Sequence, residues 1–455
     1  MKHLESTSLQ ALTDALRHLD AGFADLPDFE TSALALEAMP AVLLEAAERL
    51  RDNYPYFHPL YAGQMLKPPH PVARAAYALA MWINPNNHAL DGGRASSAME
   101  KEAVAQLAAM FGWHEFLGHL TGGGTMANLE ALWVAGRLNP GKTVLASAGA
   151  HYTHERISGV LHLPFESLPT NSDGSVDCAA LEHRASQGDI GCVVATLGTT
   201  GTGSVDALPE ILRLRDRFGF RVHADAAYGG YFTLAENLSA ATRAAFDCVP
   251  QADSIVIDPH KHGLQPYGCG CVLFRDPAVG ALYKHNSPYT YFSSKDLHLG
   301  EISLECSRPG ASAVALWATQ RLLPLVPGGE FAAGLSASRA AAITLAQRLS
   351  ENAGWFVPFA PELDIVVWAA RAESASAASA LSQQIFERAA SHNLHLALIQ
   401  LPARYFSHAG YREDQENVLC LRSVLMKPEH ANWIDEIVDR VGQAAAFPKS
   451  GGPLD

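Results

Sequence analysis

Lys261 follows a short apolar run, residues 254–258, that is rich in β-branched side chains and ends at an Asp-Pro pair. Such a run is typical of a buried strand, and α/β proteins bind their ligands at the carboxyl ends of the strands. The lysine is flanked by His260 and His262, so we expect it to be partly removed from water, a setting that favours a nucleophilic amine. An ordinary loop lysine fits this stretch equally well, and the rest of the chain must separate the two interpretations.

A glycine-rich stretch, residues 121–129 (TGGGTMANL), opens a run whose apolar spacing is typical of a helix. Three glycines before a helix leave backbone N–H groups uncovered at the positive end of the helix dipole, and Thr125 adds a hydroxyl. The stretch therefore predicts a phosphate-binding loop at Gly124 and Thr125.

Two more polar side chains are expected at strand ends of the same sheet. His151 follows one expected strand, and Asp225 ends another, two residues before Ala227. A cofactor with a phosphate, a flat ring, a basic ring nitrogen and an aldehyde would use all these groups, and pyridoxal 5′-phosphate is that cofactor. In this interpretation Lys261 holds the cofactor as a Schiff base and Asp225 keeps the ring nitrogen protonated. His151 stacks on one face of the ring, and the small Ala227 allows close approach to the other.

The segments that must position these residues alternate between strand and helix patterns. This alternation predicts an α/β fold with a mostly parallel sheet covered by helices on both faces. A capping-box pattern at residues 97–100 predicts the start of a helix that ends at Gly112. The expected strands are residues 143–147, 192–197, 220–225, 254–258 and 271–274.

Prolines and glycines cluster at residues 324–329 and would interrupt any regular element, so we expect a domain boundary there. The expected parts are an N-terminal helical and loop segment, a large α/β domain and a small C-terminal α+β domain. Their bounds are residues 1–95, 96–326 and 327–455, and strands of the small domain are expected near 364–368, 393–399 and 418–424.

The composition, 48% hydrophobic and 18% charged among 455 residues, is that of a globular protein. A formal net charge of −14 without a basic block argues against a nucleic-acid partner. The longest apolar run, residues 75–83, is too short to cross a membrane, and no secretory signal is expected. Seven cysteines without a CxxC pair indicate reduced thiols and a cytoplasmic location. No metal site is expected, because no His/Cys pairing has a second matching pair elsewhere in the sequence.

Residues 136–143 (GRLNPGKT) satisfy the Walker A pattern, so a P-loop nucleotide hydrolase is a remote alternative. A working P-loop follows a strand and opens a helix, whereas here a helix is expected before Gly136 and a strand after Lys142. Pro140 also removes a backbone N–H that a phosphate would need.

The chain resembles the group II pyridoxal-phosphate-dependent amino acid decarboxylases, the family of the aromatic L-amino acid, glutamate and tyrosine decarboxylases. The resemblance runs from about Tyr54 to the end of the chain. The residues that carry it are 121–129, 150–151 (AH), 195–201 (ATLGTTG), 223–228 (HADAAY), 258–261 (DPHK) and 305–308 (ECSR).

The resemblance implies the fold type I transferase fold of PLP enzymes and a homodimer whose active site lies near the subunit interface. The N-terminal segment, residues 1–95, would pack on the partner subunit. Lys261 would be the Schiff-base lysine, Asp225 the partner of the ring nitrogen and His151 the stacking ring. The implied phosphate contacts are Gly124, Thr125 and His260. Thr196 would lie beside the cofactor ring.

The family also has a mobile loop whose tyrosine protonates the substrate carbon after carbon dioxide leaves. The matching loop is residues 287–295, in which Tyr291 is favoured and Tyr289 is the alternative. Arg422 matches a substrate-carboxylate contact of the glutamate branch, and a structural salt bridge is left open. The aromatic loop at residues 58–61 matches the substrate entrance, so the candidate substrate-binding residues are His58, Pro59, Tyr61 and Arg422.

The implied activity is the decarboxylation of an L-amino acid to a primary amine and carbon dioxide, with an aromatic substrate favoured by the aromatic entrance. His262 stands where the family commonly has tryptophan or another large ring, which leaves the subfamily and the substrate open. The alternative activities keep the cofactor and Lys261 and change the bond that breaks. They are an aldehyde-forming oxidative decarboxylase, an aminotransferase and a carbon–carbon lyase.

Overall fold

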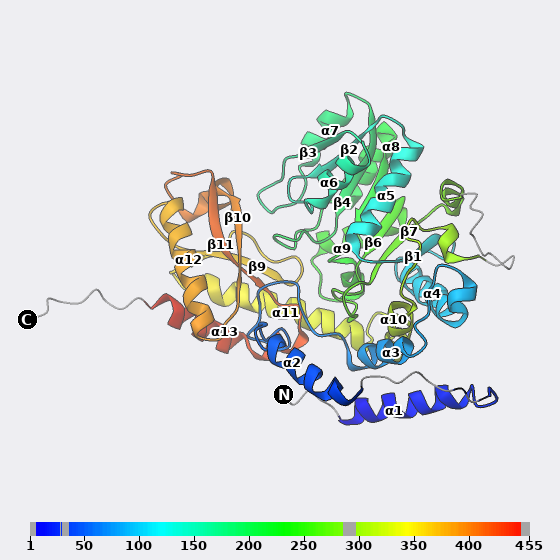
Figure 1. The fold of residues 1–455 in the computed structure, drawn as a ribbon. Helices are drawn as coiled ribbons and strands as arrows, with labels where there is room; N and C mark the ends of the chain where they lie inside the picture. The colour runs from blue at the N-terminus through cyan, green and yellow to red at the C-terminus, as the bar shows by residue number, and fades with distance from the viewer. Residues whose placement is uncertain (1–5, 28, 30–35, 285–296, 447–455) are drawn as a thin grey trace, which may run out of the picture.

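The computed structural model describes residues 6–27, 29, 36–284 and 297–446. A seven-stranded sheet forms the centre of its larger part (Figure 1). The strands are β1 (Leu117–Thr121), β2 (Thr143–Ser147), β3 (Phe165–Leu168), β4 (Ile190–Thr196), β5 (Arg221–Asp225), β6 (Ser254–Ile257) and β7 (Gly270–Phe274). Their order is β1-β7-β6-β5-β4-β2-β3, and only β7 pairs antiparallel with its neighbours. The predicted α/β fold with a mostly parallel sheet is confirmed.

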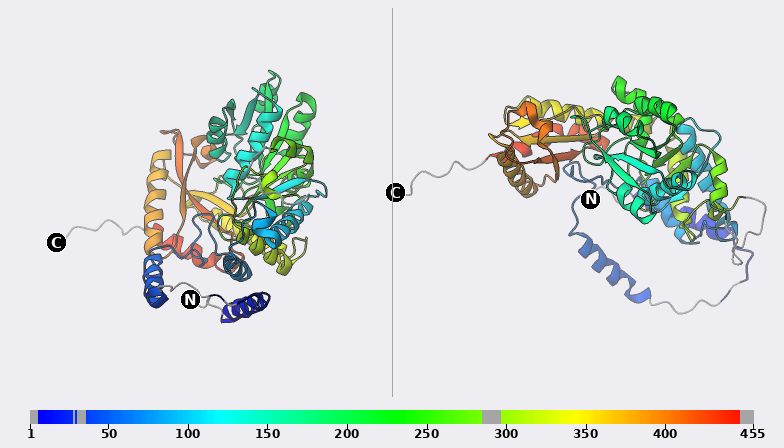
Figure 2. Two further views of the ribbon diagram at one scale, coloured as in Figure 1. Left: turned by 45° about the vertical axis from the view of Figure 1, so that its right-hand side comes forward. Right: turned by 90° about the horizontal axis from the view of Figure 1, so that it is seen from above.

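Helices cover both faces of this sheet (Figure 2). They include α4 (Leu90–Met110), α5 (Gly124–Leu138), α6 (Thr153–Val160), α7 (Cys178–Ala185), α8 (Leu208–Phe218), α9 (Ala240–Asp247) and α10 (Gly310–Leu322). Cys192 and Val194 of β4 belong to an apolar cluster with α5 and α6. The alternate residues, Val193 and Ala195, belong to the cluster that contains the apolar side of α8. Because successive side chains of a strand point to opposite faces, both faces are buried.

The five strands expected in this sheet agree with β2, β4, β5, β6 and β7 to within two residues at each end. β1 and β3 were not predicted. β1 contains Gly118 and His119, which are not typical of strands, and β3 has four residues of which only Leu168 is buried. Both lie at edges of the sheet, where the apolar pattern of a strand is weakest.

The capping box expected at residues 97–100 is wrong. Helix α4 already begins at Leu90, and Ser97 is buried within it. The carboxylate of Glu100 instead accepts hydrogen bonds from the side chain of Asn87, at 2.6 Å, and from the backbone N–H of Leu120, at 3.0 Å. These tertiary contacts override the local capping pattern. The predicted end of this helix agrees with the structure.

The Walker A stretch, residues 136–143, covers the end of α5, the turn that follows it and the first residue of β2. A helix precedes it and a strand follows it, in the order that the sequence predicted. This order is the reverse of the one that a P-loop requires.

A second, antiparallel sheet has the order β10-β11-β9-β8. Its strands are β8 (Trp355–Phe356), β9 (Ile365–Ala370), β10 (Ala397–Pro402) and β11 (Asn417–Val424), and its helices are α11 (Glu330–Ser350), α12 (Ala375–Ser391) and α13 (Ile434–Ala445). Helix α11 runs from the central part toward this sheet and contacts β9 (Figure 1). The strand expected from residue 393 begins only at Ala397, because Asn393 adopts a left-handed backbone conformation after α12 (φ 57°).

Helices α1 (Ser6–Ala21) and α2 (Met39–Leu50) lie at the lower edge of the molecule in Figure 1, and they have no buried side chain. Helix α3 (Pro71–Met81) instead packs closely on α10. Within the described ranges, no helix combines the length and apolarity needed to cross a membrane. All seven cysteines are free thiols.

Candidate active site

A cavity of about 380 Å³ lies at the carboxyl ends of β4, β5 and β6, beside the N-terminus of α5. Its size is in the range of small-molecule sites. Every residue predicted to bind the cofactor lines this cavity: Gly124, Thr125, His151, Thr196, Asp225, Ala227, His260 and Lys261. The structure therefore brings together residues that are more than 130 positions apart in the sequence, because parallel strands end at the same edge of the sheet.

Lys261 lies in the turn that follows β6 and is paired with a buried carboxylate. Its Nζ is 3.2 Å from Oδ2 of Asp258. The same carboxylate packs against the glycine loop, since a Cβ at Gly124 would lie 2.7 Å from Asp258 Oδ2. Glycine is thus required at this position, and the lysine and the start of α5 are held in direct proximity.

Asp225 ends β5 and is buried at the base of the cavity. Its Oδ1 accepts the backbone N–H of Ala227 at 3.1 Å, and its Oδ2 lies 2.8 Å from Nε2 of His154. Burial alone would raise the pKa of Asp225, but the hydrogen bond from His154 and the nearby His223 and Lys261 outweigh burial and lower it. The carboxylate is therefore ionised at neutral pH, as the partner of a protonated ring nitrogen must be.

His151 precedes α6 and lines the cavity. Burial lowers the pKa of its imidazole, so the ring is neutral at neutral pH. Its Nδ1 lies 2.8 Å from the hydroxyl of Thr153, and its ring stacks on Tyr152 with centroids 4.5 Å apart. The ring is thus oriented from both sides, as a stacking role requires.

His260 lies beside the glycine loop. Its Nδ1 is 2.8 Å from the carbonyl oxygen of Cys269, and its ring packs on Tyr267. Gly123 has a φ of +145°, a conformation open to glycine, and a Cβ there would lie 3.4 Å from the imidazole. The loop, Thr125 and His260 form one wall of the cavity, where a phosphate would meet the N-terminus of α5.

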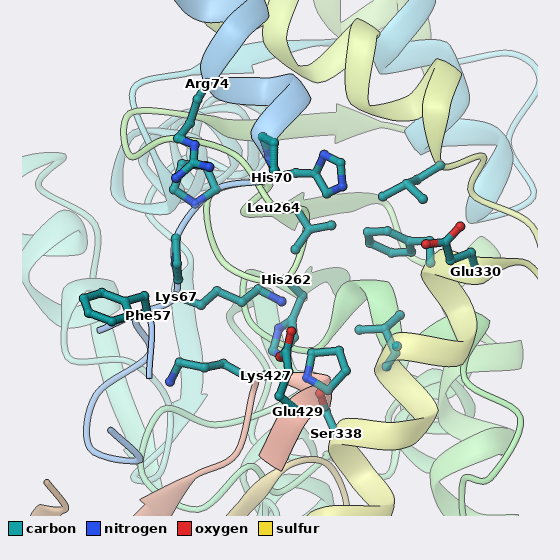
Figure 3. Close-up of a pocket in the computed structure, with 18 residues that line it drawn as sticks. Phe57, Lys67, His70, Arg74, His262, Leu264, Glu330, Ser338, Lys427 and Glu429 are labelled. Carbon is teal, nitrogen blue, oxygen red and sulfur yellow. The ribbon is translucent and has the colours of Figure 1, made fainter. Parts of the chain in front are cut away.

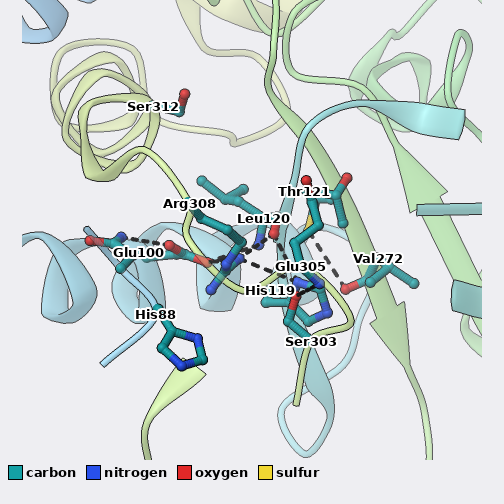
Figure 4. Close-up of polar contacts among 12 residues, drawn as sticks. His88, Glu100, His119, Leu120, Thr121, Val272, Ser303, Glu305, Arg308 and Ser312 are labelled. Carbon is teal, nitrogen blue, oxygen red and sulfur yellow. Dashed lines mark hydrogen bonds and ion pairs between the residues drawn. The ribbon is translucent and has the colours of Figure 1, made fainter. Parts of the chain in front are cut away.

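The ECSR segment, residues 305–308, lies next to the glycine loop and forms hydrogen bonds that hold it in place (Figure 4). Glu305 Oε2 accepts the backbone N–H of Gly122 at 2.9 Å. Arg308 Nη1 donates to Glu100 Oε1 at 3.0 Å and to the carbonyl oxygen of Leu120. Removing one partner of this buried ion pair would leave an uncompensated charge, so the cluster fixes the loop strongly.

The candidate substrate residues do not line this cavity. The ring of His58 packs edge-on against Trp433, with centroids 4.8 Å apart, and Tyr61 is buried. Pro59 is half-buried. Arg422 lies on β11. Burial lowers the pKa of its guanidinium, and the nearby Tyr228 and Tyr61 offset part of this shift.

Residues 55–370 match the family described as "Pyridoxal-dependent decarboxylase conserved domain". The chain belongs to this family. The match includes every residue that lines the cavity, and the family's description names the pyridoxal cofactor for which the residues were predicted. Pyridoxal phosphate is therefore the cofactor of this decarboxylase-family protein.

Curated relatives carry two substrate names. The L-tyrosine decarboxylase of Enterococcus faecium is 28% identical over 389 residues, which cover 63% of this chain and 64% of the relative. The L-aspartate decarboxylase of Thermococcus kodakarensis is 30% identical over 282 residues, covering 61% of this chain and 71% of the relative. The matched part thus spans a little under two thirds of the Enterococcus protein.

Solved structures share the fold. Mouse CSAD superposes with a TM-score of 0.78 at 18% identity, covering 97% of this chain and 99% of that chain. The structure of Oryza sativa TDC with PLP and tryptamine superposes with a TM-score of 0.76, also at 18% identity and with the same coverage. These two solved structures thus share the fold of this protein over nearly its whole length.

Thr196 gives a test of whether the cavity fits pyridoxal phosphate. It pairs directly with Asp225 across β4 and β5, and its backbone N–H donates to Asp206 Oδ2 at 2.7 Å. Its hydroxyl is buried and has no hydrogen-bond partner among the described residues. A hydroxyl, a lysine amine, an ionised carboxylate and a glycine loop on one cavity match the polar groups of this cofactor.

His262, the departure from the family pattern, faces away from the cofactor cavity. It lines a second cavity of about 570 Å³, together with Lys67 and Lys427 (Figure 3). Its Nε2 is 2.8 Å from Asp364 Oδ2, and the other oxygen of Asp364 accepts the hydroxyl of Tyr228 at 2.5 Å. Tyr228 lines the cofactor cavity, so this buried trio lies between the two cavities.

Sequence reasoning did not single out His154 or Asn128 as partners of Asp225, nor Asp258 as the partner of Lys261. The spacing of His154, three residues after His151 at the start of a helix, was the signal available. Its contact with a residue 71 positions away becomes visible only in the folded chain.

Proposed function

We propose that the protein decarboxylates an L-amino acid to its primary amine and carbon dioxide. The observation that carries the proposal is that the amine of Lys261 and the ionised carboxylate of Asp225 line one cavity, from the ends of the adjacent strands β6 and β5. The family and the names of the curated relatives support it.

When bound, pyridoxal phosphate supplies an electron-poor ring that accepts the electron pair left behind when a carboxylate departs as carbon dioxide. Lys261 would hold the cofactor covalently and give way to the amine of the substrate. Asp225 would stabilise the proton on the ring nitrogen, and the neutral ring of His151 would cover one face. Thr196 would direct its hydroxyl at the edge of the ring, beside Asp225.

The substrate remains to be chosen between an aromatic and an acidic amino acid, and we favour the aromatic one because of the aromatic loop near Tyr61. The test is incubation of the purified enzyme, loaded with pyridoxal phosphate, with each common amino acid. We expect carbon dioxide and an amine in equal amounts from tyrosine or a related aromatic substrate. Release from aspartate alone would overturn the aromatic preference, and an aldehyde or a keto acid would favour the alternative reactions.

Arg422 is proposed to bind a carboxylate of the substrate. Its Nε and Nη2 are buried without hydrogen-bond partners among the described residues, and no ion pair engages it in that part of the chain. This leaves the alternative of a structural salt bridge without support. A buried guanidinium with unused donors is suited to a planar anion.

For Arg422→Met we expect KM to rise about 10- to 100-fold, the equivalent of one or two charge-assisted hydrogen bonds, with a smaller change in kcat. Steady-state kinetics on the best substrate measure this. The matched control is Arg412→Met, because Arg412 is exposed. Equal KM values for the two variants would contradict the proposed contact.

Tyr291 is proposed as the residue that protonates the substrate carbon, with Tyr289 as the alternative; both lie outside the described residues. For Tyr291→Phe we expect amine formation to fall at least about 100-fold, the scale of a lost general acid, with carbonyl products appearing. Chromatography of the products measures this, and Tyr289→Phe should retain amine formation. The reverse result would assign the role to Tyr289.

A homodimer is proposed because the N-terminal helices expose large apolar side chains, which a partner subunit would remove from water. They include Leu9 on α1 and Met39, Val42, Leu43, Leu44 and Leu50 on α2. Helix α2 lies apart from the two sheets in both views of Figure 2. Sedimentation equilibrium should give twice the chain mass of 48.7 kDa, and a fully active monomer would contradict the proposal.

A cytoplasmic location is proposed because the seven cysteines are free thiols, and cell fractionation would test it.

A further inference from the structure

His154 is a second histidine at the cofactor cavity, placed behind Asp225. It lies in the first turn of α6 and is almost fully buried, with 1% of its surface exposed. Its Nε2 is 2.8 Å from Asp225 Oδ2. It does not line the cavity itself, so any effect on the cofactor must pass through the carboxylate.

The hydrogen bonds of Asp225 single out His154. Oδ1 accepts the backbone N–H of Ala227, which any residue at that position would supply, apart from proline. Oδ2 has two side-chain donors, Asn128 Nδ2 at 3.4 Å and His154 Nε2 at 2.8 Å. Hydrogen bonds weaken as the distance lengthens, so His154 is the main side-chain donor to this carboxylate.

The surroundings of His154 fix which ring nitrogen carries the proton. Its Nδ1 is buried and has no hydrogen-bond partner among the described residues. A proton on Nδ1 would therefore be a buried donor without an acceptor, whereas a proton on Nε2 points at Asp225. The ring is thus held as a donor to Oδ2.

Asn128 is aligned by a separate histidine and does not replace His154. His223 Nε2 lies 2.8 Å from Asn128 Oδ1, and His223 Nδ1 lies 2.8 Å from the hydroxyl of Ser254. Burial lowers the pKa of His223 to about 3, so this imidazole is neutral and directs the amide of Asn128 toward Asp225. The two histidines therefore reach Asp225 by different routes, and only His154 touches it.

One helical turn places His151 and His154 at the cofactor cavity. The backbone N–H of His154 donates to the carbonyl oxygen of His151 at 3.1 Å. His151 faces the cavity from the start of this turn, while His154 contacts the carboxylate at its base. The stacking ring and the support of Asp225 are thus fixed to each other by backbone geometry.

We propose that His154 is a positioning residue for pyridoxal phosphate, which fixes the orientation and the negative charge of Asp225 at the ring nitrogen. The affinity for the cofactor and the electron-withdrawing strength of its ring then depend on this imidazole. The effect on turnover rests on the proposed decarboxylation, whereas the effect on cofactor binding does not.

The test compares His154→Leu, which fills similar space without a donor, with His154→Gln, whose amide can still donate to Asp225. The full-length apo forms are titrated with pyridoxal phosphate and followed by visible absorbance at several pH values. For His154→Leu we expect the dissociation constant to rise about tenfold, with an altered pH dependence of the absorption band. For His154→Gln we expect most of the affinity to return. His114→Leu, at an exposed position, is the matched control and should bind like the parent.

Turnover and thermal unfolding complete the test. His154→Leu should lower kcat at least about tenfold, while Tm values of the Leu and Gln variants stay similar. Unchanged cofactor affinity and absorbance in His154→Leu would overturn the proposal. So would a Gln variant as weak as the Leu variant, because packing alone would then explain the loss. If no amino acid releases carbon dioxide from the parent enzyme, the proposed function fails while the cofactor titration still decides the role of His154.

Discussion

Lys261→Ala is expected to abolish turnover and to remove the visible absorption band that reports the covalent bond to pyridoxal phosphate. Among the described residues, Lys261 supplies the only lysine amine that lines the cavity, so no neighbour can replace it. We expect kcat to fall at least about 1,000-fold, since the loss of a covalent nucleophile has effects of this size or larger. Spectra and single-turnover kinetics of the reconstituted variant measure both effects.

Lys142→Ala is the control for this experiment. Lys142 is exposed in the turn between α5 and β2 and is the lysine of the Walker A pattern. We expect it to leave the absorption band and turnover unchanged. An intact band in Lys261→Ala would refute the assignment of the anchor, and a strong loss in Lys142→Ala would revive the nucleotide hydrolase.

Asp225→Asn is expected to lower kcat about 100- to 1,000-fold, the range seen when one preorganised electrostatic contact is removed from an active site. Asparagine keeps the size of the side chain but removes the charge that stabilises a protonated ring nitrogen. Its amide nitrogen would also face donors, because His154 and Ala227 both direct N–H groups at this position. The variant should therefore bind pyridoxal phosphate more weakly as well.

The measurements are kcat, KM and the dissociation constant of the cofactor, with Asp216→Asn as an exposed control. We expect KM for the amino acid to change less than kcat, because the carboxylate is proposed to contact the ring nitrogen of the cofactor and not the substrate. A variant with near-parent kcat would mean that the ring does not need its protonated nitrogen, and the proposed decarboxylation would then need another electron sink.

The residues proposed to bind the cofactor could be placed at one cavity from the sequence, because each of them ends or closely follows a strand or opens a helix. Lys261 follows β6, Asp225 ends β5, and Thr125 lies in the first turn of α5. In a parallel sheet these ends lie at one edge, so position along the chain translates into position in space. The five apolar strands were predictable for the same reason, since a strand buried on both faces has a continuous apolar sequence.

Side-chain partners could not be predicted, because their sequence separations carry no periodic signal. Asp364 meets His262 from 102 positions away, and Arg308 meets Glu100 from 208. The same contact of Glu100 explains the wrong capping box, since a carboxylate used by a distant arginine is not available to its own helix. The candidate substrate residues rest on the resemblance alone, and among them His58 packs on Trp433.

The trio of Tyr228, Asp364 and His262 connects the two sheets at the residue that follows Lys261. Asp364 immediately precedes β9 of the second sheet, whereas His262 follows Lys261 without a gap. A displacement of the second sheet would therefore act on the turn that carries Lys261 through the hydrogen bond between Asp364 and His262. Redesign of the loop before β9 should accordingly retain Asp364, because its loss would remove the hydrogen bonds that connect the second sheet to Tyr228 and His262.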